Sequence, residues 1–124
     1  TILGQQVSMP LILAPTGYTR IADSQGELAV ARAADRAGVP YSLSTMGTRA
    51  IEEVAAVNTG HKWFQVYTWR DRGLVKELVQ RAAAAGYSAL WLTVDTAVVY
   101  APVQGGSLRD LLPSPSAAPT GVEF

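Results

Sequence analysis

The feature of this sequence that most constrains its fold is a regular alternation of short apolar segments with helix-forming segments. The apolar segments are typical of buried strands and lie at residues 10–14, 41–44, 62–67 and 88–94. Segments rich in helix-forming residues lie between them, at 27–37, 50–57 and 72–85. Strands that are apolar throughout need cover on both faces, and repeated strand–helix units form parallel sheets with right-handed crossovers. The sequence therefore predicts an α/β protein.

Two architectures fit these repeats, a doubly wound open sheet and part of an eight-stranded (β/α)8 barrel. A dinucleotide-binding sheet carries a G-x-G-x-x-G turn after its first strand. Here the first strand is followed by Pro15-Thr16-Gly17, and Gly4, Gly17 and Gly26 have neither that spacing nor that of a P-loop. This weakens the dinucleotide-binding fold and leaves both architectures open.

The composition excludes several kinds of chemistry. Ten Lys and Arg residues balance ten Asp and Glu residues, so bulk charge does not hold the chain to nucleic acid or to a membrane surface. The absence of cysteine excludes disulfides, thiolate ligands and cysteine nucleophiles, and a single histidine argues against a multi-histidine metal site. No apolar run reaches the ~18 residues of a membrane span, and the first residues do not resemble a signal peptide. We expect a cytoplasmic protein without a transmembrane segment.

Polar side chains gather where the expected strands end. These ends read Ala14-Pro15-Thr16-Gly17, Ser44-Thr45-Met46, Gln65-Val66-Tyr67 and Thr93-Val94-Asp95-Thr96. In both architectures the ligand site lies at the carboxyl ends of the strands. Ser44, Gln65 and Thr93 can donate to and accept from a planar heteroaromatic ring without adding charge. Tyr67 shares a strand face with Gln65 and can bond a substrate oxygen.

An alternative explanation is that these polar groups only cap helices and satisfy backbone atoms, but the strand ends together favour a polar, mostly uncharged site. His61 precedes the strand at 62–67, so we expect it in a solvent-exposed loop at the opposite end of the sheet. A histidine base, if the chemistry needs one, is then not in this chain. Trp63, Trp69 and Trp91 lack a surrounding basic stripe, which favours core packing over nucleic-acid stacking.

These motifs resemble, in order and spacing, the FMN-dependent 2-hydroxy acid dehydrogenases and oxidases, which include glycolate oxidase, flavin-type L-lactate dehydrogenase and mandelate dehydrogenase. The similar segments lie between residue 1 and about residue 97, at 9–17, 26–29, 31–34, 43–45, 51–55, 63–67, 70–72 and 92–96. The resemblance implies a TIM (β/α)8 barrel with FMN at the carboxyl ends of its strands. This chain would supply the N-terminal half, about four βα units with parallel strands.

The resemblance also implies roles for the residues at the strand ends. Cofactor contacts would come from Pro15, Thr16, Gly17, Ser44, Gln65 and Thr93, of which the last three would hydrogen-bond the isoalloxazine ring. Two residues would be catalytic: Tyr67 would contact the substrate carboxylate or hydroxyl, and Asp95 would orient the catalytic histidine. A carboxylate partner fixes the tautomer of an imidazole and stabilises the imidazolium. Met46 stands where some members have a Trp that shapes the substrate pocket. No metal is implied.

The sequence departs from the family pattern after Asp95. Pro102 stands where the family has an arginine for the substrate carboxylate. The family's flavin-supporting lysine, histidine base, second arginine and FMN-phosphate loops belong to later strands, and its substrate-binding N-terminal tyrosine precedes this segment. We expect residues 1–97 to be the first half of an FMN-binding barrel and residues 98–124 to be a divergent loop or tail rich in Pro, Gly and Ser.

The function expected from the resemblance is part of an FMN-dependent oxidoreductase that converts L-2-hydroxy acids to 2-oxo acids. Its partner would be a small hydroxy-acid substrate, with no nucleic acid, and the full-length family could form homo-oligomers. If a quinone accepts the electrons, the protein would lie at the periphery of a membrane. The alternatives are a non-catalytic half-barrel without the histidine base and another FMN barrel, such as an isomerase of the isoprenoid type.

Overall fold

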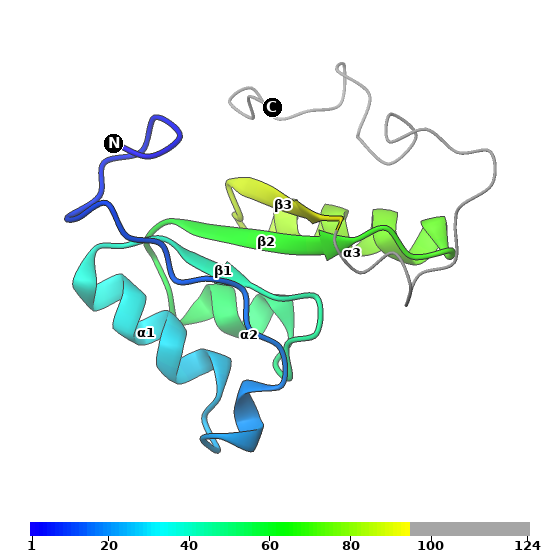
Figure 1. The fold of residues 1–124 in the computed structure, drawn as a ribbon, viewed down its shortest axis with the longest axis horizontal. Helices are drawn as coiled ribbons and strands as arrows, with labels where there is room; N and C mark the ends of the chain where they lie inside the picture. The colour runs from blue at the N-terminus through cyan, green and yellow to red at the C-terminus, as the bar shows by residue number, and fades with distance from the viewer. Residues whose placement is uncertain (95–124) are drawn as a thin grey trace.

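The computed structural model describes residues 1–94, so Asp95 and the expected tail at 98–124 lie outside the described residues. Figure 1 shows the elements in chain order. They are the 3-10 helix η1 (Thr19–Ile21), α1 (Glu27–Ala37), β1 (Tyr41–Leu43), α2 (Ile51–Ala56), β2 (Lys62–Tyr67), α3 (Arg72–Ala84) and β3 (Ala89–Thr93). The predicted alternation of strand and helix is confirmed. None of the helices within residues 1–94 is long and apolar enough to cross a membrane.

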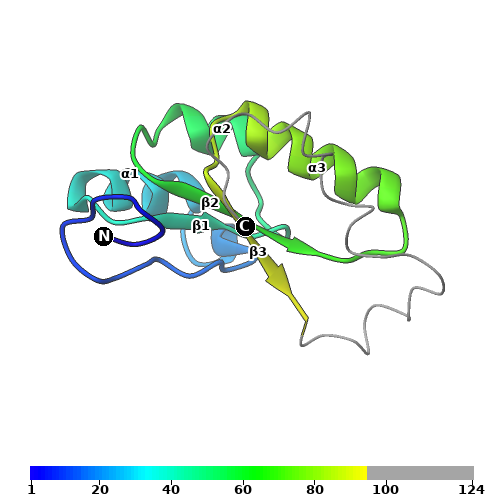
Figure 2. The ribbon, with the colours of Figure 1, turned by 90° about the horizontal axis from the view of Figure 1, so that it is seen from above.

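The three strands form one parallel sheet in the order β1-β2-β3. The register pairs Leu43 of β1 with Phe64 of β2, and Tyr67 of β2 with Thr93 of β3. All three carboxyl ends therefore lie at the same end of the sheet. The helices pack against one face, with α1 on β1 and α3 on β2, as Figure 2 shows from above. Helices on one face of a parallel sheet are the arrangement of a partial (β/α)8 barrel.

The predicted strand at 10–14 is present only as a single bridge. The Leu13 N–H donates to the Pro40 carbonyl at 2.9 Å, and the Leu13 carbonyl accepts from the Ser42 N–H at 3.0 Å. This segment therefore runs parallel to β1 at Tyr41 and lies along the edge of β1 opposite to β2. The expectation that it is fully buried is wrong, because Leu11 is 48% exposed and no strand among residues 1–94 pairs with its outer edge.

The helix ends follow local chemistry that the sequence already indicates. Gly38 ends α1 in the left-handed region, at φ 64°, where a residue with a Cβ is strained. Asp71 caps α3, since its Oδ1 accepts from the Leu74 N–H at 3.0 Å. These two residues fix where α1 ends and where α3 begins.

The two faces of the sheet have different environments. Phe64 and Val66 of β2 pack under the helices in the main apolar core, together with Val75 and Val79 of α3. Side chains alternate along a strand, so Trp63, Gln65 and Tyr67 point to the opposite face. Over its amino-terminal half that face is covered by the start of the chain, where the Trp63 indole N–H donates to Gln5 Oε1 at 3.4 Å.

β3 is less buried than its apolar sequence predicts. Trp91 packs against Trp63 with 5.7 Å between ring centroids, yet remains 42% exposed. Leu92 is 38% exposed and Val94 is 76% exposed. The prediction that both faces of this strand are covered is therefore wrong within residues 1–94, because Trp91 and Leu92 point to opposite faces and each is more than a third exposed.

Candidate active site

The carboxyl ends of the strands surround a cavity of about 420 Å³. Its lining residues are Pro15, Gly17, Tyr18, Ser44, Met46, Gln65, Tyr67 and Thr93. This volume lies in the range of roughly 300–1,000 Å³ that is usual for small-molecule sites. Within residues 1–94 the lining contains no Asp, Glu, Lys, Arg or His, so the described wall of the cavity is polar without carrying a full charge.

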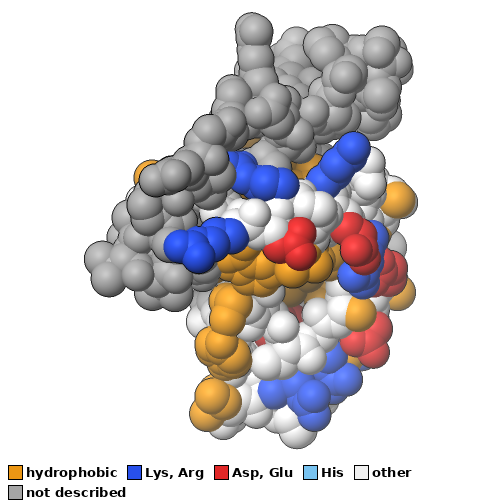
Figure 3. All heavy atoms as spheres, turned by 90° about the vertical axis from the view of Figure 1, so that its right-hand side faces the viewer, with side chains coloured by type: hydrophobic (Ala, Val, Ile, Leu, Met, Phe, Trp, Pro, Cys, Tyr) orange, Lys and Arg blue, Asp and Glu red, His pale blue; other side chains and the backbone are white. Residues whose placement is uncertain are grey.

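Figure 3 shows the end of the molecule toward which β2 points. On this face hydrophobic side chains form a band, and Lys, Arg, Asp and Glu side chains lie around it. Among the described residues of this face charges of both signs are thus mixed, and such a mixture does not produce the strong single-sign field that steers a highly charged ligand.

Gln65 is the centre of the hydrogen-bond network in the cavity. It is 2% exposed, and its Oε1 accepts from the Thr45 N–H at 3.1 Å and from the Ser44 hydroxyl at 3.2 Å. Its Nε2 donates to the Thr93 hydroxyl at 2.7 Å. Because a backbone N–H can only donate, the Thr45 bond fixes the amide oxygen toward β1 and the NH2 group toward β3. One side chain therefore ties together the ends of all three strands.

The network leaves capacity for a ligand. Gln65 Nε2 has a second proton, and the Thr93 hydroxyl accepts from Gln65 and so has its own proton to donate. Ser44 Oγ donates to Gln65 and accepts from the Met46 N–H at 3.1 Å, which leaves it one acceptor position. Uncharged donors and an acceptor in one cavity suit a neutral ring that carries both carbonyl and N–H groups.

The loop after residues 10–14 and the loop after β1 meet at the rim of the cavity. The Tyr18 N–H donates to the Met46 carbonyl at 3.0 Å. A Cβ at Gly17 would lie 3.0 Å from the Met46 Cβ, so the absence of a side chain there allows the close approach. Tyr18 itself has φ 55°, an uncommon conformation for an aromatic residue.

The structure brings most of the predicted site residues together. Pro15, Gly17, Ser44, Gln65, Tyr67 and Thr93 all line the cavity. Thr16 does not: its side chain is exposed, and its hydroxyl donates to the Ala14 carbonyl at 3.4 Å. Asp95 lies outside the described residues. The roles assigned to these residues remain predictions.

Two contributors were missed at the sequence level. Tyr18 lines the cavity because of its backbone bond to Met46, and no spacing rule signals such a bond. Thr45 holds both ends of Gln65, since its N–H donates to Oε1 and its hydroxyl donates to the Gln65 carbonyl. His61 does lie at the opposite end of β2, but it is partly buried rather than in a free loop. Its Nε2 is 2.9 Å from the Gln6 carbonyl.

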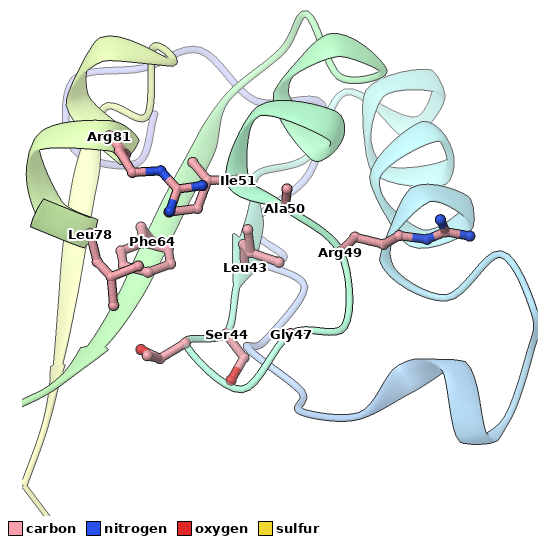
Figure 4. A pocket seen from close by; sticks show the side chains of 10 residues that line it. Leu43, Ser44, Gly47, Arg49, Ala50, Ile51, Phe64, Leu78 and Arg81 are labelled. Atoms are coloured by element: carbon pink, nitrogen blue, oxygen red, sulfur yellow. The ribbon is translucent and has the colours of Figure 1, made fainter. Parts of the chain in front are cut away.

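A second hollow of about 180 Å³ lies on the helix side of the turn after β1 (Figure 4). Phe64, Leu78 and Arg81 form one wall, and the turn itself forms the other. Arg81 does not offer a free charge there, because its Nε and Nη2 each donate to a Glu52 oxygen at 2.9 Å. The larger cavity is therefore the better candidate for the functional site.

Parallel strands, helices on the outer face and a polar cavity at the strand carboxyl ends define a partial (β/α)8 barrel with its ligand site in the usual place. The chain belongs to the FMN-dependent dehydrogenase family, whose model matches residues 1–105. The sequence-based assignment to this family and to the partial barrel is confirmed.

Individual relatives agree with this assignment. The chain is 47% identical over 114 residues to an L-lactate oxidase of Nostoc sp., covering 89% of this chain and 30% of that protein. It is 48% identical over 96 residues to glycolate oxidase of Spinacia oleracea, covering 77% of this chain and 26% of that protein. A crystal structure of mandelate oxidase superposes with a TM-score of 0.74 at 46% identity, covering 77% of this chain and 29% of the other. The chain thus spans less than a third of the length of each.

Proposed function

We propose that residues 1–94 form the flavin-contacting part of an FMN-dependent enzyme that oxidises L-2-hydroxy acids to 2-oxo acids. The observation that carries this proposal is the Gln65 network, which presents uncharged donors and an acceptor in a cavity of suitable size. The names of the relatives support the substrate class, since lactate, glycolate and mandelate are all 2-hydroxy acids.

The residues present fit an isoalloxazine ring. That ring is planar and neutral and carries both carbonyl oxygens and an N–H group, so it complements the free protons of Gln65 and Thr93 and the acceptor on Ser44. Pro15, Gly17 and, in our proposal, Thr16 would border the ring. When bound, FMN supplies the redox chemistry by taking up the two electrons of the substrate.

The other site residues would act on the substrate. Converting a 2-hydroxy acid to a 2-oxo acid removes two electrons and two protons, one from the hydroxyl and one from C2. Tyr67 faces the same cavity as Gln65, where its hydroxyl would bond a substrate oxygen and orient C2. In our proposal Asp95 orients a histidine base that the rest of the protein supplies.

A second candidate function is flavin binding without turnover by this chain. The observation that favours it is the chemistry of the cavity, whose lining among the described residues includes no histidine or carboxylate. The only histidine of the chain lies at the amino-terminal end of β2. We further propose that the substrate is a small molecule and that the full-length family could form homo-oligomers. The proposed location is the cytoplasm, or the periphery of a membrane if a quinone accepts the electrons.

One experiment separates these functions. The purified 124-residue chain is titrated with FMN while flavin fluorescence is followed, and then assayed with a panel of L-2-hydroxy acids and a dye acceptor. We expect weak but saturable quenching and no dye reduction. Turnover would show that the chain contains its own base, and no quenching at any FMN concentration would contradict the flavin site.

A further inference from the structure

We propose that Glu27 is a positioning residue for the cavity: its buried carboxylate holds the turn after β1 in the conformation that presents Ser44 and Met46 to the ligand. The ligand in this proposal is FMN, so this part rests on the proposed function. Glu27 does not line the cavity itself, and its effect would pass through the turn.

Both oxygens of the Glu27 carboxylate accept hydrogen bonds from the turn. Glu27 is the first residue of α1 and is 0% exposed. Its Oε1 accepts from the Thr48 N–H at 2.8 Å, and its Oε2 accepts from the Thr48 hydroxyl at 2.8 Å. Figure 4 shows the course of the turn from Ser44 through Gly47 to Ala50, between β1 and α2. Helix α1 and this turn are thereby joined at one point.

A buried carboxylate costs free energy unless its hydrogen bonds are satisfied. Among residues 1–94 no lysine or arginine pairs with Glu27, so hydrogen bonds alone must stabilise the charge. Burial raises the pKa of Glu27, but the side chain of Thr19 and the bonds from Thr48 outweigh it, and the pKa lies below its usual value. Glu27 is therefore ionised at neutral pH and accepts with both oxygens.

The turn that Glu27 holds is tight and leads directly to the cavity. The Gly47 N–H donates to the Ser44 carbonyl at 2.9 Å. A Cβ at Gly47 would lie 3.0 Å from both Leu43 Cδ1 and the Ser44 oxygen, and 3.6 Å from Glu27 Oε1. The turn has little room to shift while Thr48 is anchored, so the anchor fixes the Ser44 hydroxyl that faces Gln65.

The turn that Glu27 holds is also bonded to the other loop at the rim. Thr48, which Glu27 anchors, lies two residues after Met46. Tyr18 in turn bonds the Met46 carbonyl. Loss of the carboxylate should therefore loosen the turn and, through the Tyr18–Met46 bond, the loop beside it.

The test compares Glu27→Ala and Glu27→Gln with the matched control Glu53→Ala in the 124-residue chain. Glu53 is exposed, and its Oε2 accepts from the Ala50 N–H at 2.9 Å, so the control removes a carboxylate bond from the end of the same turn. Two quantities are measured: amide hydrogen exchange at residues 44–48 without FMN, and the dissociation constant of FMN from fluorescence quenching.

We expect Glu27→Ala to speed exchange at Thr48 and Met46 and to weaken FMN binding, each by about tenfold or more, as suits loss of a bond to a charged group. Glu27→Gln keeps an acceptor for the Thr48 N–H and should recover most of both. Glu53→Ala should change neither by more than about twofold. If Glu27→Ala does not fold, Glu27→Asp replaces it, because it keeps the charge but shortens the reach to Thr48.

Unchanged exchange in Glu27→Ala, or in Glu27→Asp where that replaces it, would overturn the proposal, and so would faster exchange with unchanged FMN binding. Equal effects from Glu53→Ala would also overturn it, since the role would not be specific to Glu27. If the unsubstituted chain does not bind FMN at all, the proposed cofactor fails. In that case the exchange measurements alone still decide whether Glu27 holds the turn.

Discussion

The Gln65 amide donates to the Thr93 hydroxyl at 2.7 Å, although the β2–β3 register places Gln65 opposite Trp91 and Thr93 opposite Tyr67. The bond therefore runs diagonally, toward the carboxyl end of β3. With this bond in place, the Gln65 amide and the neighbouring Tyr67 both form part of the cavity wall. A long polar side chain at position 65 is needed to make this reach.

We first predict the effect of removing that amide. Gln65→Leu keeps the approximate size of the side chain but leaves the Thr45 N–H and the Ser44 hydroxyl without a hydrogen-bond acceptor. Each of these groups that stays buried should lower the free energy of unfolding by about 1–3 kcal/mol. Urea unfolding should show a loss in this range, and fluorescence titration should show a weaker complex with FMN. Thr93→Ser, which keeps the hydroxyl, is the control and should bind FMN like the parent chain. Wild-type affinity in Gln65→Leu would argue against this site.

A second prediction concerns the positive φ angle of Tyr18. Tyr18→Gly removes the strain of the left-handed conformation, worth about 1 kcal/mol, and at the same time removes a wall of the cavity. We expect unfolding stability to stay level or rise while ligand affinity changes. Leu3→Gly is the matched control, since Leu3 has φ 47° and is 70% exposed, outside the cavity lining. Its stability should also rise, with no change in FMN binding.

A third prediction separates stability from the site. Asp71→Ala removes the side-chain cap of α3 and should lower the free energy of unfolding by about 1 kcal/mol. Asp71→Ser, which can still accept from the Leu74 N–H, should lose less. Both variants should bind FMN with parent affinity, because Asp71 does not line the cavity. A large loss of binding would mean that α3 and the site are coupled.

The fourth prediction is an acid dependence of stability. The pKa of Glu27 is lower in the folded chain than in the unfolded chain, so its contribution is complete above the unfolded pKa and is lost as pH falls through the folded value. Glu52 acts in the same direction, since its hydrogen bonds to Arg81 lower its pKa to about 2. Urea unfolding between about pH 6 and pH 3 should therefore show a shallower decline in Glu27→Gln and in Glu52→Gln than in the parent chain. Parallel curves would contradict the assigned direction.

Local chemistry explains which elements could be predicted from the sequence. The bounds of α1 and β2 agree with the predicted ranges because Gly38 ends the helix and the apolar run of β2 is covered on both faces. The segment at 10–14 reads as the same kind of strand, yet it makes one bridge. Its apolar composition indicates that its side chains can be buried, but it does not indicate whether another element of the fold covers them.

The site divides in the same way. Gln65, Ser44 and Thr93 could be inferred because parallel strands must bring their carboxyl ends together. The parts played by Tyr18 and Glu27 depend on bonds to Met46 and Thr48 in a loop about 20 residues away or more, and no local pattern encodes such contacts. Positions that act through tertiary contacts were thus the ones the sequence could not supply.

The central position of Gln65 also couples ligand binding to folding. Its amide is held by residues from both neighbouring strands, so its remaining proton is correctly aimed only when the sheet is assembled. A ligand that takes this proton binds the assembled sheet and not the unfolded chain, and at a hundred times its dissociation constant it adds about 2.7 kcal/mol to the unfolding free energy. Even a ring-shaped ligand that binds weakly should therefore raise the melting temperature of the chain measurably.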